Sequence, residues 1–111
     1  MVVKPINLAV EVGSQSIFEC STDSTERRIQ WHFAREEEDV PQLVFVGYSA
    51  NKLFGSRYSI DMEDGRYTLT ITNTRTSDSG KYSCEETGDP ISSSAELIVF
   101  GKIAIYVFHK V

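Results

Sequence analysis

Short runs in which apolar and polar residues alternate recur along the chain, and turn-forming residues separate them. Because successive side chains of a β-strand point to opposite faces, a period of two predicts strands with one buried and one solvated face. No repeat, low-complexity tract or linker interrupts this pattern. We therefore expect one all-β domain in which two sheets pack together. The predicted strand segments are residues 17–20, 29–34, 43–46, 66–72, 81–85 and 94–99.

A helix is not supported anywhere in the sequence. The best candidate, residues 34–39, has no apolar stripe, contains three adjacent glutamates and stops before Pro41. We predict a solvated loop there. A calcium-binding loop would need oxygen ligands at alternate positions around a glycine bend, which this segment lacks.

The composition restricts the range of partners. The chain has 111 residues, the size of one ordinary domain, and carries 16 acidic against 11 basic residues, a net charge of −5. Nucleic acids and anionic membrane surfaces are therefore not expected as partners, because both require a basic face. No apolar stretch approaches the ~20 residues of a membrane span, and residues 1–5 do not resemble a leader peptide. Membrane attachment would have to come from a longer parent chain.

Residues with catalytic potential do not form a recognisable pattern. No sequence pattern pairs His32 or His109, the only histidines, with a nucleophile, and there is neither a Cys-x-x-Cys pair nor a glycine-rich phosphate loop. We expect no enzyme activity, no cofactor and no metal site. Recognition of another molecule is the class of function that remains.

One group of residues resembles the immunoglobulin superfamily over nearly the whole chain. The most specific part is the pattern Asp78-x-Gly80-x-Tyr82-x-Cys84. Trp31 follows Cys20 by 11 residues, as does the family's core tryptophan after its first cysteine. Further matches are the pair Leu69-x-Ile71 and the arginine at position 57.

This resemblance implies a two-sheet Greek-key sandwich of immunoglobulin type with one disulfide, Cys20–Cys84, between the sheets. Trp31 and Tyr82 would pin the core, and Arg57 would form a salt bridge with Asp78. A disulfide implies an oxidising compartment, and hence a secreted or cell-surface domain. The alternative is a pair of buried free thiols in an intracellular domain.

The subtype follows from the length between Trp31 and Arg57, which leaves room for two additional strands. Residues 41–48 resemble the additional strand that variable-type domains possess and constant-type domains lack. We therefore expect the variable type (V-set), and the intermediate type (I-set) is the second choice.

The C-terminal region allows two interpretations of the last strand. In the first, which we favour, residues 93–99 form this strand, the domain core spans about residues 3–99, and 100–111 are an apolar tail. In the second, Phe100-Gly101 resembles the joining segment of antigen receptors, and the last strand runs from about 102 to 108. Ile103 stands where that segment has its second glycine. Either way, residues 97–99 or 103–108 are more apolar than a lone sandwich requires, and such exposed segments usually mark contacts.

In variable-type domains, the loops at one end and the exposed face of the larger sheet bind partners. The loops correspond here to residues 21–28, 47–52 and the segment after Glu85. The alternation of inward and outward residues, together with the resemblance to variable-type domains, predicts the residues of the partner-binding face. They are Gln30, His32, Ala34, Pro41, Leu43, Val46, Ser83 and Glu85. The candidate self-association segment comprises Phe100, Ile103, Ile105, Tyr106 and Phe108.

We therefore predict an extracellular recognition module of an immune-type receptor or adhesion protein, which binds a protein ligand or a second copy of itself. The first alternative is an intermediate-type structural module of an intracellular filament protein. The second is a soluble immune effector that binds microbial or carbohydrate surfaces.

Overall fold

The computed structural model of the chain describes residues 3–22, 28–35, 37, 40–46, 49–87 and 92–101. Within these ranges the secondary structure consists of β-strands and two single-turn 3₁₀ helices. The elements are β1 (Leu8–Glu11), β2 (Ser16–Ser21), β3 (Ile29–Ala34), β4 (Gln42–Val46), β5 (Ser49–Ala50), η1 (Lys52–Phe54), β6 (Tyr58–Glu63), β7 (Arg66–Ile71), η2 (Thr76–Asp78), β8 (Gly80–Glu86) and β9 (Ser92–Phe100).

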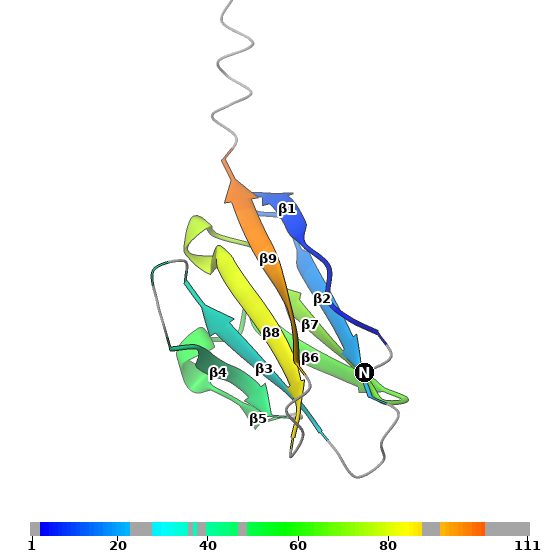
Figure 1. The fold of residues 1–111 in the computed structure, drawn as a ribbon. Helices are drawn as coiled ribbons and strands as arrows, with labels where there is room; N and C mark the ends of the chain where they lie inside the picture. The colour runs from blue at the N-terminus through cyan, green and yellow to red at the C-terminus, as the bar shows by residue number, and fades with distance from the viewer. Residues whose placement is uncertain are drawn as a thin grey trace, which may run out of the picture.

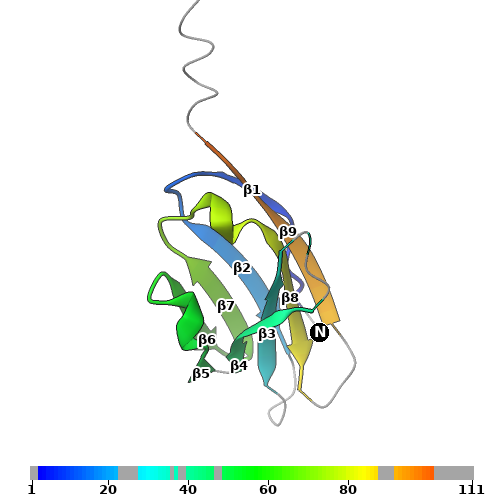
Figure 2. The same ribbon diagram turned by 90° about the vertical axis from the view of Figure 1, so that its left-hand side faces the viewer.

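The strands form two sheets that face each other (Figures 1 and 2). The larger sheet has the order β1-β9-β8-β3-β4-β5, and the smaller sheet has the order β2-β7-β6. All neighbouring pairs are antiparallel except β1 and β9, which run parallel. The predicted all-β, two-sheet immunoglobulin-like sandwich is confirmed.

The last described strand is β9, which pairs antiparallel with β8 and places Ala95 opposite Tyr82. It occupies the segment favoured by the first of the two interpretations. The second interpretation expected residues 86–99 to be a long loop, whereas most of them lie in β9. Residues 103–108 lie outside the described part of the chain.

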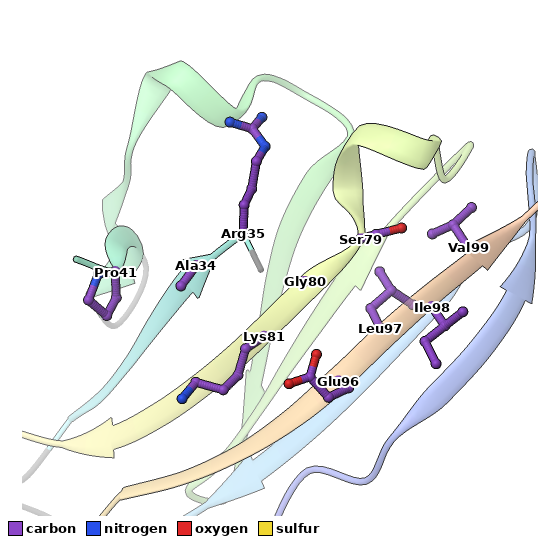
Figure 3. Close-up of a pocket in the computed structure, with 10 residues that line it drawn as sticks. All are labelled: Ala34, Arg35, Pro41, Ser79, Gly80, Lys81, Glu96, Leu97, Ile98 and Val99. Carbon is purple, nitrogen blue, oxygen red and sulfur yellow. The ribbon is translucent and has the colours of Figure 1, made fainter. Parts of the chain in front are cut away.

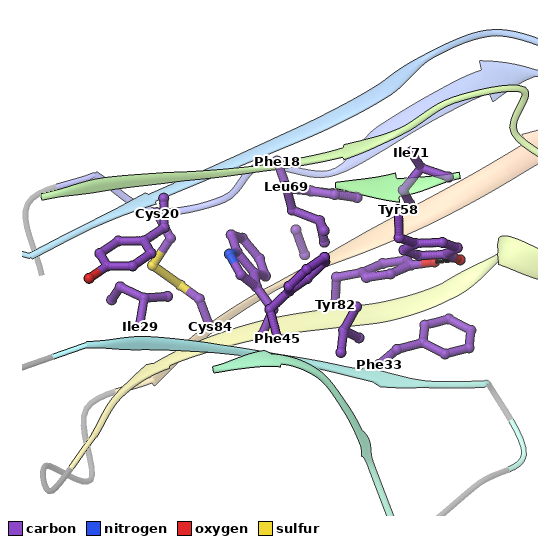
Figure 4. Packing of buried hydrophobic residues seen from close by; sticks show 14 of the residues in the cluster. Phe18, Cys20, Ile29, Phe33, Phe45, Tyr58, Leu69, Ile71, Tyr82 and Cys84 are labelled. Carbon is purple, nitrogen blue, oxygen red and sulfur yellow. Dashed lines mark hydrogen bonds between the residues drawn. A yellow bond between two sulfur atoms is a disulfide. The ribbon is translucent and has the colours of Figure 1, made fainter. Parts of the chain in front are cut away.

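The core lies between the sheets and is rich in aromatic side chains (Figure 4). Tyr82 is central to it, with ring centroids 5.0 Å from Phe18 and 4.8 Å from Phe33. The disulfide Cys20–Cys84 joins β2 of the smaller sheet to β8 of the larger sheet, as expected. Trp31 is fully buried and lies opposite Cys84 in the β3–β8 register. The inward residues of the predicted alternating runs therefore form one continuous core.

Candidate functional site

The two sheets are joined at one end of the sandwich by a hydrogen-bonded network around the carboxylate of Asp78. Arg57 approaches it with both terminal nitrogens: Nη1 lies 2.7 Å from Oδ2, and Nη2 lies 3.0 Å from Oδ1. The Tyr58 hydroxyl donates to Oδ1 at 2.6 Å, and the Arg75 backbone N–H donates to Oδ2 at 2.7 Å. The Tyr82 hydroxyl donates to the Asp78 carbonyl oxygen at 2.6 Å. The expected Arg57–Asp78 salt bridge is thus present, and the hydroxyl of Tyr82 anchors the same turn.

Burial and hydrogen bonding set the protonation of this network. Burial alone would raise the pKa of the Asp78 carboxyl, but the hydrogen bonds from Arg57, Tyr58 and Arg75 outweigh it and hold the pKa below its usual range. Burial raises the pKa of the Tyr58 and Tyr82 phenols well above their usual value. Near neutral pH the Asp78 carboxyl is therefore ionised and both tyrosines are neutral. We assign this network to stability and not to chemistry.

Gly80 begins β8 directly after this network and allows β8 to approach β3 closely. Its φ of 152° is unfavourable for residues with a side chain. A Cβ atom there would lie 2.5 Å from the Ala34 carbonyl oxygen and 2.8 Å from the Phe33 ring. The glycine is therefore required where the two strands meet.

The outward side of the larger sheet, here called the outer sheet face, carries most of the predicted partner-binding residues. His32 lies in register with Ser83 on one side and Leu43 on the other. Gln30, in the next row, lies between Glu85 and Val46. Pro41 and Leu43 are exposed, and the other five are half-buried: Gln30, His32, Val46, Ser83 and Glu85.

A register shift in β3–β4 explains why both Leu43 and Val46 are on the outer sheet face although three positions separate them. The shift falls between Trp31 and His32, and it leaves both Val44 and Phe45 buried. Such a bulge places two residues of one strand opposite one residue of the partner strand. Simple alternation along β4 could not place both side chains outward.

Ala34 was predicted to belong to the partner-binding face, but it is buried. It lies on the outward side of β3, but only 7% of it is exposed. Its side chain is a single methyl group, and it lies opposite the long side chain of Lys81 in the β3–β8 register. The residue contributes to the floor of a hollow and does not itself form an accessible contact surface.

This hollow is a groove of about 560 Å³ on the outer sheet face (Figure 3). Ala34 and Gly80 lie in its middle, Pro41 lies on one side, and Ile98 of β9 lies on the other. Lys81 and Glu96, which are cross-strand partners, project beside each other at its edge. Sequence reasoning singled out residues 97–99 as unusually apolar but did not include Lys81, Glu96 or Ile98 in the binding face. Their alternation with buried Tyr82, Ala95 and Leu97 was the available signal.

The outer sheet face is also apolar at the β9 side of the groove. Ile98 is 61% exposed and Phe100 is 48% exposed, although both lie on a strand that is paired on both sides. Phe100 was the first residue of the candidate self-association segment. Ile103, Ile105, Tyr106 and Phe108, the others of that segment, lie outside the described residues.

Of the predicted binding loops, residues 23–27, 47–48 and 88–91 lie outside the described part of the chain. The second loop, predicted at 47–52, is in part regular structure, because residues 49–50 form β5 and Lys52 begins η1. Two of the loops are joined at their bases. The Thr87 N–H donates to the Arg28 carbonyl at 2.8 Å, and the Arg28 N–H donates to the Thr87 hydroxyl at 3.0 Å. The described side chains contain no cluster of three or more residues suited to holding a metal ion. No helix in the described ranges has the length and apolarity needed to cross a membrane.

Comparison with known proteins supports the fold assignment. The family model of the immunoglobulin I-set domain matches residues 1–99. No curated protein matches the sequence significantly. The larger sheet does contain the additional strand β4 and a two-residue β5, as in variable-type domains, but the family match is to the intermediate subtype, our second choice. The chain therefore belongs to the immunoglobulin I-set family.

Proposed function

We propose that this domain is an extracellular recognition module that binds a protein partner noncovalently through the outer sheet face. The observation that carries the proposal is the groove beside Ile98 and Phe100, two large apolar side chains that the sandwich leaves exposed. Exposed apolar patches with a polar rim on small domains mark contact surfaces. Polar side chains of His32, Ser83 and Glu85 continue the face away from the groove.

The opposite face of the molecule is a poorer candidate for protein recognition. The outward residues of the smaller sheet include Glu19, Asp61, Glu63 and Arg66, all exposed. Ile17 is the one large apolar side chain exposed on the described strands of that sheet. Charged residues are depleted from the centres of protein interfaces. The outer sheet face therefore fits a protein partner better.

The disulfide between β2 and β8 supports placement outside the cell, in a receptor or adhesion protein, because the cytosol keeps thiols reduced. The main alternative is an intracellular filament module. A thiol titration of denatured protein, isolated from its native source under alkylation, separates the two. We expect Cys20 and Cys84 to be inaccessible to alkylation, whereas free thiols would exclude the extracellular assignment.

Binding to a panel of purified secreted and cell-surface proteins tests the recognition surface. His32→Asp introduces a negative charge at a half-buried position of the outer sheet face, and Thr70→Asp introduces the same charge at a half-buried position of the smaller sheet, where its cross-strand neighbours Ile17 and Ser59 are uncharged. We expect His32→Asp to abolish binding and Thr70→Asp to retain it. The opposite result would move the site to the other sheet. Binding confined to a glycan panel would favour the soluble-effector alternative.

A further inference from the structure

We infer that the partner of the outer sheet face is a second copy of this chain, with Ile98 of each copy seated at the groove of the other. The inference rests on the proposed function, because it uses the same face. A symmetric dimer requires a surface that is complementary to itself. The pairing of β8 with β9 supplies that property.

The outward residues of β8 and β9 form three cross-strand pairs. Lys81 lies opposite Glu96, Ser83 opposite Ser94, and Glu85 opposite Ser92. Each pair joins groups that attract or can hydrogen-bond: a cation with a carboxylate, a hydroxyl with a hydroxyl, and a carboxylate with a hydroxyl. None of the three pairs joins like charges.

Consider a two-fold axis that lies in the interface, over the outer sheet face, parallel to β8 and β9 and midway between them. This axis turns the attraction within each cross-strand pair into attraction between the two copies. Rotation about it places β8 of one copy over β9 of the other, so each outward residue faces the equivalent of its own cross-strand partner. Lys81 then faces Glu96 of the second copy twice, once on each side of the axis. Like charges at these positions are kept apart, although the chain as a whole carries a net charge of −5.

The same rotation aligns the apolar side chain with the hollow. Because Gly80 lies opposite Leu97, the next position along β9, Ile98, lies level with Ser79. Ile98 of the second copy is thereby placed over Ser79, the residue directly before β8, which lines the groove beside Gly80. A large side chain that is 61% exposed thus meets the hollow where the chain enters β8 through the two small residues Ser79 and Gly80.

The overlap of the two outer sheet faces limits the strength of such a dimer. With the axis between β8 and β9, β3 of one copy covers β1 of the other, so four strands of each copy overlap. Spaced about 4.8 Å apart, with the nine residues of β9 spanning about 30 Å, these four strands outline about 430 Å². A standard interface buries about 800 Å² of each partner. We therefore expect a dimer in reversible equilibrium with the monomer.

Sedimentation equilibrium of the full chain over a wide concentration range tests the inference. The wild-type mass should rise from the monomer's 12.5 kDa towards twice that value. Lys81→Glu and Glu96→Lys should each raise the dissociation constant about tenfold or more, because each puts like charges together at two symmetric positions. The double variant with both changes exchanges the charges and should restore dimerisation. Failure of this rescue, with thermal unfolding showing that all variants fold, would overturn the proposed geometry.

A second set of variants tests the apolar contact. Ile98→Asp should leave the chain monomeric, whereas Ile17→Asp, the same change at an exposed isoleucine of the smaller sheet, should leave the dimer unchanged. A dimer that survives Ile98→Asp but is lost in Ile105→Asp would assign self-association to the C-terminal segment and overturn the inference. So would a wild-type chain that remains monomeric at all concentrations. In that case, binding of a panel protein that His32→Asp abolishes would leave the proposed function standing.

Discussion

Replacement of Asp78 by alanine removes the acceptor on which one end of the sandwich depends. Four side-chain hydrogen bonds are lost: two from Arg57, one from the Tyr58 hydroxyl and one from the Arg75 backbone N–H. The Tyr58 hydroxyl is buried and retains only its contact with the Tyr82 hydroxyl at 3.1 Å. The Arg57 guanidinium remains charged beside a vacated site. A buried donor and a partly buried charge are therefore left without their main partner.

The expected loss of stability in Asp78→Ala depends on how deeply its hydrogen-bond partners are buried. Hydrogen bonds to a charged group contribute about 1.5–3 kcal/mol each, but bonds that share one carboxylate are not additive. Removing one partner of a fully buried ion pair costs about 3–5 kcal/mol. The Arg57 side chain is 21% exposed, so water compensates part of its loss. We expect Asp78→Ala to lower the free energy of unfolding by about 3 kcal/mol, which corresponds to about 12 °C in Tm for a chain of this length.

The lowered pKa of Asp78 also makes the free energy of unfolding depend on pH, and the variant Asp78→Asn tests this dependence. The folded state holds this carboxyl ionised where the unfolded chain would protonate it, so the stabilisation is present above the unfolded pKa of about 3.9. It is lost as the pH falls through the folded pKa. Asp78→Asn cannot titrate at this position. Its free energy of unfolding should therefore fall less steeply in acid than that of the wild type.

Urea unfolding, followed by tryptophan fluorescence near neutral pH and in an acid series, measures both effects. Asp61→Ala, at an exposed carboxylate of β6, is the control and should change the free energy of unfolding by less than about 0.5 kcal/mol. A loss below about 1 kcal/mol in Asp78→Ala would refute the reasoning. An acid dependence of Asp78→Asn equal to that of the wild type would refute the assignment of the pKa.

Three further changes test the core. Trp31→Ala should lower the free energy of unfolding by about 3–5 kcal/mol, because it empties a fully buried site, and chemical denaturation measures this loss. Gly80→Ala should destabilise by more than about 1 kcal/mol, since its Cβ would approach the Ala34 carbonyl at 2.5 Å; an unchanged Tm would contradict this. Replacing both Cys20 and Cys84 by alanine should cost about 4 kcal/mol for a sequence separation of 64 residues, and a variant as stable as the wild type would disprove the role of the bridge.

The sequence pattern predicted the strands β2, β3, β4, β7, β8 and β9 and most of the residues that fill the core, whereas β6 was not predicted although its inward and outward residues alternate. Residues 29–34 were predicted as a strand and are β3, and the inward side chains of β7 and β8 are buried as their period of two indicated. Alternation within a segment indicates the strand and its buried face, because consecutive side chains of any strand point to opposite faces of the sheet. The four-residue β1 had no such signal, since its place in the sheet depends on parallel pairing with β9.

The tertiary structure decided which outward residues are accessible and which lie side by side. Ala34 points outward yet is buried, because its exposure depends on the longer side chains around it. The shift opposite β3 brought Leu43 and Val46 to one face. The groove combines Pro41, Gly80 and Ile98 from three separate segments. The period of two along a strand determines which face of the sheet a side chain lies on. Which residues of other strands lie next to it depends on strand order and register, and these arise only when distant segments of the chain pair.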